Sequence, residues 1–259
     1  MNIVSVTILG VVEGVTEFLP ISSTAHLILV SKFLNLPQTD FQKFFEVFIQ
    51  SGAILPVLVL YAGYLLRHRD VVGKVLVSFV PTAAVGFFFF RTIKSVFFES
   101  IPLMLGMLFL IGALFLLLEY FIEKKHIRLT KTLNHLSYSD AILIGLVQSI
   151  AIMPGVSRAG IILVGMMVLG YRRHEAAIYS FLLAIPTIFA ASALDLYKSR
   201  DLLFGFQSNV LLLSVGFIVS FFTAYLSVEW FITHLKTKTL HLFGFYRIAV
   251  AIILLVSVV

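Results

Sequence analysis

Six polar residues of types that can do chemistry stand inside otherwise apolar stretches of the sequence. They are Glu13, Glu17, Ser23, His26, Glu46 and Arg158. Glu13 and Glu17 are four residues apart, which places both carboxylates on one face of a helix. Two carboxylates so close repel each other unless a cation or a proton lies between them. Arg158 can pair with one of them at most, and the other then needs a metal ion or a catalytic role.

Hydroxyl, imidazole and guanidinium groups follow at positions that suit the binding of an anion. Residues 22–24 are typical of a helix N-cap, whose free backbone N–H groups and positive dipole end attract an anion. Ser157 and Arg158 form a second such start, with a guanidinium that can hold a phosphate at two points. His26 lies three residues after Ser23, on the same face of the new helix. Each residue alone has an ordinary structural interpretation, but the set suits phosphoryl transfer by positioning and charge stabilisation.

The elements that must position these residues belong to a membrane protein. Hydrophobic residues make up 60% of the 259-residue chain, charged residues 12%, and the mean hydropathy is +1.05. A soluble domain carries about 25% charged residues. The lack of cysteine excludes a disulfide framework, a thiolate metal site and a cysteine nucleophile. Since the basic residues lie in short loops between apolar segments, the positive-inside rule explains the net charge of +6, and we expect no nucleic-acid partner.

The apolar segments are of two kinds. Six are long enough to cross a membrane: 44–65, 71–90, 101–119, 176–195, 209–229 and 242–259. Two others, 3–34 and 139–170, are interrupted by the helix-breaking stretches Leu19-Pro20-Ile21-Ser22-Ser23-Thr24 and Pro154-Gly155-Val156-Ser157-Arg158. Because their halves are too short to cross alone, we predict two re-entrant hairpins. Non-helical backbone at membrane depth must be buried in protein or line a wet cavity, so the breaks are candidate functional sites.

The two interrupted segments align when the chain is shifted on itself by 135 residues. Gly10 then falls on Gly145, Glu13 on Gln148, Ser22 on Ser157 and Ala25 on Gly160. Three predicted spans follow each hairpin. We therefore predict an all-α polytopic membrane protein, a single integral membrane domain over 1–259, with an inverted-topology repeat. The repeats cover about 1–125 and 138–259, each a re-entrant hairpin plus three transmembrane helices, with the site near the midplane.

The charges of the loops predict an orientation. Eleven Lys and Arg residues lie in the loops 66–74, 120–138, 171–175 and 233–241. The other side carries six: Lys32, Lys43, Arg91, Lys94, Lys198 and Arg200. The excess places the first set of loops in the cytoplasm. Both termini, and the opening of the first hairpin, then face the extracytoplasmic side.

A long signature stands in the first interrupted segment: Glu13-Gly14-Val15-Thr16-Glu17-Phe18-Leu19-Pro20-Ile21-Ser22-Ser23-Thr24-Ala25-His26. It closely resembles the signature of the bacterial undecaprenyl-diphosphatase family associated with bacitracin resistance. Further blocks resemble the family in the same order: Phe45-Glu46-Val47-Phe48-Ile49-Gln50, Pro154-Gly155-Val156-Ser157-Arg158, Phe181-Leu182-Leu183-Ala184-Ile185-Pro186, Asp195-Leu196-Tyr197-Lys198 and Tyr246-Arg247. The resemblance covers nearly the whole chain.

The resemblance implies an enzyme of the bacterial inner membrane that removes one phosphate from a polyprenyl diphosphate and so recycles the lipid carrier of peptidoglycan synthesis. It also implies a divalent cation, Mg²⁺ or Ca²⁺, which we expect at Glu13 and Glu17. The matching blocks place substrate-binding residues at Ser22, Thr24, Glu46, Gln50, Gly155 and Ser157. Neither the oligomeric state nor the preferred polyprenyl length follows from these motifs.

The second break departs from the family pattern at three positions. Ala159 stands where the family has serine, and Ile161 and Ile162 stand where it has Ala-Thr. Two hydroxyls that can contact phosphate are therefore missing. Because Ser157 and Arg158 remain, we expect the activity to survive.

Our mechanistic hypothesis gives each catalytic residue a role. Ser23 attacks the terminal phosphorus and His26 serves in proton transfer, while Glu13 and Glu17 hold the cation or one of them acts as base. Arg158 and the half-helix N–H groups stabilise the developing charge. One alternative makes His26 the nucleophile, through a phosphohistidine, with Ser23 as an oxygen ligand.

A second alternative changes the function. The same inverted-repeat scaffold suits a transporter or flippase of a lipid phosphate or another anion. Phosphate release in detergent distinguishes the two functions, since detergent abolishes any gradient.

Overall fold

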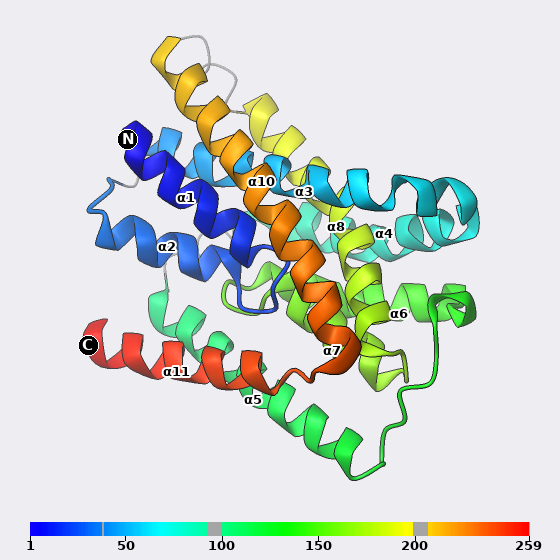
Figure 1. Cartoon of the computed structure of the whole chain (residues 1–259). Coiled ribbons are helices and arrows are strands. Elements are labelled where there is room, and N and C mark those ends of the chain that lie inside the picture. The colour runs from blue at the N-terminus through cyan, green and yellow to red at the C-terminus, as the bar shows by residue number, and fades with distance from the viewer. Residues whose placement is uncertain (38, 93–99, 199–206, 259) are drawn as a thin grey trace.

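The computed structural model describes residues 1–37, 39–92, 100–198 and 207–258, and their regular elements are helices (Figure 1). The longer helices are α3 (Asp40–Arg67), α4 (Arg69–Thr92), α5 (Ile101–Glu123), α8 (Arg173–Lys198), α10 (Gln207–Thr237) and α11 (His241–Val258). The interrupted segments form α1 (Ile3–Thr16), α2 (Ser23–Phe33), α6 (Tyr138–Ser149) and α7 (Arg158–Val168), with the short 3-10 turn η3 (Ile150–Ile152). A second 3-10 turn, η2 (Leu133–His135), precedes α6.

Five of the longer helices, all but α11, are long and apolar enough to cross a membrane. The sixth predicted span corresponds to α11, whose 18 residues rise about 27 Å at about 1.5 Å per residue, close to the hydrocarbon thickness of about 30 Å. The prediction of an all-α polytopic membrane protein is therefore confirmed. Lys94 and Arg200, which the loop count assigns to the outer side, lie outside the described residues.

Polar side chains mark the starts of several helices. The Asn2 side chain accepts a hydrogen bond from the backbone N–H of Ser5 at 2.8 Å, and the Ser5 hydroxyl accepts one from the Asn2 N–H at 3.0 Å. This capping box begins α1. Thr39 and Ser137 cap α3 and α6 more simply. Each side chain accepts one hydrogen bond from a backbone N–H in the first turn of its helix.

The two interruptions are built alike. Pro20 and Pro154 lie in them, and a proline has no N–H and disfavours helical backbone in the residue before it. Each new helix then starts after a serine with left-handed backbone, Ser22 at φ 74° and Ser157 at φ 71°. The predicted boundary of the first break was too late, because Ser23 and Thr24 form the first turn of α2.

Each hairpin packs on a long helix from the other half of the chain. α1 lies along α10, and α6 lies along α4 (Figure 1). Glycines allow both contacts: a Cβ on Gly10 would come within 2.9 Å of the Gly216 carbonyl of α10, and a Cβ on Gly145 within 2.2 Å of the Ser78 carbonyl of α4. Gly10 and Gly145 are the positions that the 135-residue shift aligns. The inverted repeat remains a prediction, and this reciprocal packing supports it.

Candidate functional site

One buried arginine joins the two breaks. Arg247 of α11 is fully buried, and its guanidinium donates to the carbonyls of Pro20 at 2.9 Å, Gly155 at 2.5 Å and Val156 at 3.1 Å. Its Nε donates to the Leu108 carbonyl of α5 at 3.2 Å. The first and second breaks are therefore held against each other by a residue that the sequence reasoning named only as part of a matching block. Its charge within an apolar segment was the signal that could have identified it.

The second break comes too close to α5 for a side chain. Gly155 has φ 90°, and a Cβ placed there would lie 2.2 Å from the carbonyl oxygen of Met104. Glycine is the residue that accepts both the left-handed backbone and the close approach. Gly155 therefore allows the second break to pack against α5, and its role in substrate binding stays a prediction.

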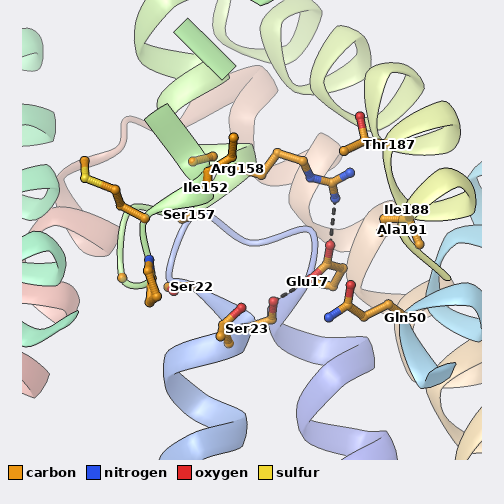
Figure 2. Close-up of a pocket in the computed structure, with 15 residues that line it drawn as sticks. Glu17, Ser22, Ser23, Gln50, Ile152, Ser157, Arg158, Thr187, Ile188 and Ala191 are labelled. Carbon is orange, nitrogen blue, oxygen red and sulfur yellow. Dashed lines mark hydrogen bonds and ion pairs between the residues drawn. The ribbon is translucent and has the colours of Figure 1, made fainter. Parts of the chain in front are cut away.

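A cavity of about 150 Å³ lies between the two breaks (Figure 2). Its walls come from both breaks, from the first turns of α2 and α7, and from α3 and α8. The lining residues are Glu17, Ser22, Ser23, Thr24, Gln50, Ala151, Ile152, Met153, Pro154, Gly155, Ser157, Arg158, Thr187, Ile188 and Ala191. The first backbone N–H groups of a helix have no partner within it, so α2 and α7 both present an anion-binding end here.

Glu17 connects the groups in this cavity that can do chemistry. The Ser23 hydroxyl donates a hydrogen bond to Glu17 Oε2 at 2.5 Å, and Arg158 Nη2 donates to Glu17 Oε1 at 2.7 Å. Figure 2 shows the Glu17 carboxylate between the two side chains, with the Gln50 amide beside it. A hydroxyl, a carboxylate and a guanidinium are thus brought together from both halves of the chain. This arrangement can activate a serine and stabilise an anion.

Two buried polar groups lie beside this connection. Both carboxylate oxygens of Glu13 and the Nη1 of Arg158 lack a hydrogen-bond partner among the described residues. Glu13 is fully buried on α1, one turn before Glu17. Since a buried charge or donor without a partner is costly, both groups are candidates to contact a ligand.

The predicted site residues divide into those that line the cavity and those that do not. Ser22, Thr24, Gln50, Gly155 and Ser157 join Glu17, Ser23 and Arg158 in its lining. Of the hydroxyls, that of Ser157 accepts a hydrogen bond from the Gly160 N–H at 3.2 Å and so caps α7, whereas Ser22 makes no side-chain cap for α2. Glu13, His26 and Glu46 are not among the lining residues.

Glu46 and His26 make hydrogen bonds elsewhere. Oε1 of Glu46 accepts from the Ser31 hydroxyl at 2.9 Å and from the Gln42 amide at 2.7 Å, which ties α3 to α2. Of the His26 ring nitrogens, Nδ1 lies 2.8 Å from the Ser22 carbonyl and Nε2 lies 2.7 Å from the Tyr246 hydroxyl. Ser23 and His26, expected on one face of α2, therefore contact different neighbours.

The lining also contains residues that sequence reasoning missed. Thr187, Ile188 and Ala191 of α8 form one wall. The Thr187 hydroxyl donates to the Leu183 carbonyl at 2.8 Å, an ordinary bond for a threonine in an apolar helix. A lone threonine in a spanning segment therefore does not indicate a functional site.

The three departures of the second break do not line the cavity. Ala159, Ile161 and Ile162 are buried, and the two isoleucines pack in the main apolar core. None of the three is among the lining residues. That the activity survives these departures stays a prediction.

Known proteins match this chain along nearly its whole length. Residues 6–253 match the family described as bacitracin resistance protein BacA. A protein named undecaprenyl-diphosphatase from Aquifex aeolicus is 42% identical over 246 residues, which are 95% of this chain and 94% of that one. Proteins of the same name from Wolinella succinogenes and Persephonella marina are each 42% identical, over 98% and 100% of both chains respectively.

Proposed function

The chain belongs to the bacitracin resistance protein BacA family, and we propose on that premise that it is an undecaprenyl-diphosphatase. It hydrolyses the lipid diphosphate to the monophosphate and inorganic phosphate. Relatives that bear this name match the chain from end to end. The observation that carries the proposal at the site is the Glu17 carboxylate held between the Ser23 hydroxyl and the Arg158 guanidinium.

In the first step Ser23 is the nucleophile and Glu17 the base. The Ser23 oxygen forms a bond to the terminal phosphorus while its proton passes to Glu17 Oε2, along the 2.5 Å hydrogen bond. The bond between that phosphorus and the bridging oxygen breaks. The lipid monophosphate leaves with the electron pair and takes the proton from Glu17.

In the second step water hydrolyses the phosphoserine. Glu17, again a carboxylate, takes a proton from the water as its oxygen attacks the phosphorus. The Ser23 oxygen leaves and receives that proton, so the enzyme returns to its starting state. Inorganic phosphate is released, and one water is consumed in each cycle.

Charge on the transferred phosphate is stabilised by groups that already face the cavity. Arg158 Nη1 is a buried donor without a partner among the described residues, while Nη2 holds Glu17. The first N–H groups of α2 and α7 add fixed dipoles. Donors arranged in advance around a developing charge are the largest contribution in many acyl and phosphoryl transfers.

The residues fit a divalent cation, although they supply few ligands. No group of three or more histidine, cysteine, aspartate or glutamate side chains that could hold a metal occurs among the described residues. Mg²⁺ in phosphate-handling enzymes is commonly bound by one or two carboxylates plus substrate oxygens. Glu13, with both oxygens unpartnered, would hold the cation together with the spare lone pairs of Glu17. The bound cation would neutralise negative charge on the diphosphate.

The alternative with His26 as nucleophile has less support. Both of its ring nitrogens have hydrogen-bond partners, and the ring is not part of the cavity lining. The transport alternative gains no support from the names of the relatives.

The proposed place of the enzyme is the inner membrane, with access from the extracytoplasmic side. The loop charges support that orientation. Carrier diphosphate is released by wall synthesis on that face, so hydrolysis there returns the monophosphate to the cycle and confers bacitracin resistance.

Phosphate release from undecaprenyl diphosphate by the full chain, purified in detergent, tests this function. We expect release by the unmodified protein and a loss of about 10⁴-fold or more in Ser23→Ala. Ser214→Ala, exposed on α10 and outside the cavity, is the matched control. Acid-stable phosphate on serine supports the mechanism, and acid-labile phosphate on histidine contradicts it. No release from any polyprenyl diphosphate would refute the function.

A further inference from the structure

The His26 ring holds a residue of the site instead of entering the cavity itself. Nδ1 contacts the Ser22 carbonyl at 2.8 Å, and a carbonyl oxygen only accepts hydrogen bonds. Nδ1 must therefore carry a proton. In the neutral ring Nε2 is then an acceptor, so the Tyr246 hydroxyl donates to it at 2.7 Å. A chain of directed hydrogen bonds runs from Tyr246 through His26 to the backbone of Ser22.

Ser22 is a backbone position that needs such support. Its φ of 74° lies in the left-handed region, which residues other than glycine populate sparsely. Backbone of this kind persists when surrounding contacts hold it. Because Ser22 directly precedes Ser23, rotation of the peptide between them would move the Ser23 hydroxyl away from Glu17, with which it makes a 2.5 Å bond.

Helix α11 holds this turn at two points. Arg247 donates to the Pro20 carbonyl at 2.9 Å. Its neighbour Tyr246 reaches the Ser22 carbonyl through His26, and the His26 and Tyr246 rings are stacked at 9° with centroids 5.7 Å apart. Two consecutive residues of α11 therefore fix the backbone on either side of Ile21.

We propose that Tyr246 is a positioning residue for the phosphatase reaction. Its hydroxyl fixes His26 as the Nδ1–H tautomer, and His26 fixes the Ser22 carbonyl and thereby the Ser23 nucleophile. The inference rests on the proposed function, since it takes Ser23 as the nucleophile. It gives His26 a positioning role through its Nδ1–H, with no proton transferred to or from the substrate.

The first test measures kcat and KM of purified full-length variants with undecaprenyl diphosphate. Tyr246→Phe keeps the ring and removes only the hydroxyl, so kcat should fall about 3- to 10-fold, the rate equivalent of one hydrogen bond, at unchanged KM. Tyr120→Phe, exposed on α5, is the matched control and should match the unmodified protein. A Tyr246→Phe enzyme with unchanged kcat would overturn the proposal.

The second test separates positioning from imidazole chemistry. An asparagine at position 26 can donate from its side-chain amide to the Ser22 carbonyl, as Nδ1 does, but cannot act as a nucleophile or a proton carrier. His26→Asn should therefore be much faster than His26→Ala. If the two variants are equally slow, the positioning role is wrong.

The third readout does not depend on turnover. Nitrogen-15 NMR of histidine-labelled protein, with the His26 signals identified by their loss in His26→Asn, should show the Nδ1–H tautomer. That preference should weaken in Tyr246→Phe. An Nε2–H tautomer in the unmodified protein would refute this inference and leave the proposed function intact. A protein with the expected tautomer and no phosphatase activity would refute the function.

Discussion

At the scale of single residues, Glu17 has one partner on each carboxylate oxygen, Ser23 on Oε2 and Arg158 on Oε1. Arg158 orients the carboxylate, but its positive charge also makes the carboxylate a weaker proton acceptor. An incoming phosphate carries more charge than Glu17, and we expect it to compete for the guanidinium. Glu17 is then freed to accept the Ser23 proton when substrate is present.

Replacement of Glu17 by glutamine tests this role. Glu17→Gln keeps a hydrogen-bond acceptor for Ser23 or Arg158 but cannot take a proton at neutral pH. We expect kcat to fall about 10²- to 10⁴-fold, the usual contribution of general acid–base catalysis. Glu229→Gln, exposed on α10, is the control and should turn over normally. Turnover of Glu17→Gln near that of the control would exclude Glu17 as base.

Glu13 leads to a different expectation, because its oxygens are buried and have no partner among the described residues. A buried carboxyl without a hydrogen bond is costly, and glutamine keeps its shape without a charge. Glu13→Gln should therefore unfold at the same or a higher temperature than the unmodified protein. It should also lose any stimulation by Mg²⁺, and chelator should no longer slow it further. A variant that still responds to Mg²⁺ as the unmodified protein does would show that Glu13 does not hold the cation.

The sequence predicted these residues better than it predicted their neighbours. Opposite charges in apolar segments allowed a pair between Arg158 and one glutamate at most, and the structure shows Glu17 as the partner. The sequence did not reveal that His26 contacts Tyr246, because Tyr246 lies 220 positions away along the chain. The side of α2 on which a polar group finds a partner depends on which helix packs there, and periodicity alone does not contain that information.

At the scale of elements, close approach of α1 and α10 makes Gly14 sensitive to any side chain. A Cβ at Gly14 would lie 2.0 Å from the Thr223 hydroxyl and 2.6 Å from the Ser220 carbonyl. Small residues at such contacts let membrane helices approach closely. Because Glu13 and Glu17 lie on either side of Gly14 along α1, a shift of this helix would also displace the carboxylates.

Substitution of Gly14 by alanine should therefore reduce both stability and activity. We expect Gly14→Ala to lower the melting temperature in detergent and to destabilise the fold by about 1–3 kcal/mol, as overpacking usually does. Gly63→Ala is a matched control, since a Cβ there meets no atom within 4 Å. Equal melting temperatures for the two variants would contradict the packing of α1 against α10.

Local sequence patterns predicted the helices themselves better than they predicted where each helix begins and ends. Pro20 and Pro154 correctly marked two interruptions, because each proline lies among polar or glycine residues that also disfavour a continuous helix. Proline alone was not the signal, since Pro56, Pro81 and Pro186 lie inside α3, α4 and α8. The start of α2 at Ser23 depends instead on the left-handed backbone of Ser22. That conformation is held by distant contacts from α11, which no local pattern encodes.

At the scale of the whole molecule, the cavity is too small for the entire substrate. Pockets that enclose drug-sized ligands measure about 300–1,000 Å³, whereas this one measures about 150 Å³. The headgroup alone would occupy it, and the polyprenyl chain would remain among the apolar helix surfaces. Both termini lie at the left of Figure 1.

The loop charges predict the side from which the headgroup enters, because they favour an orientation with the opening of the first hairpin outside. Thr24 lines the cavity, and the chain has no cysteine, so Thr24→Cys provides a unique thiol. A membrane-impermeant reagent added to intact cells should label it, and added undecaprenyl diphosphate should protect it. Lys32→Cys should label from outside without protection, and Lys124→Cys only in opened cells. The reverse pattern, with Lys124→Cys reactive in intact cells, would invert the topology and place the active site on the cytoplasmic side.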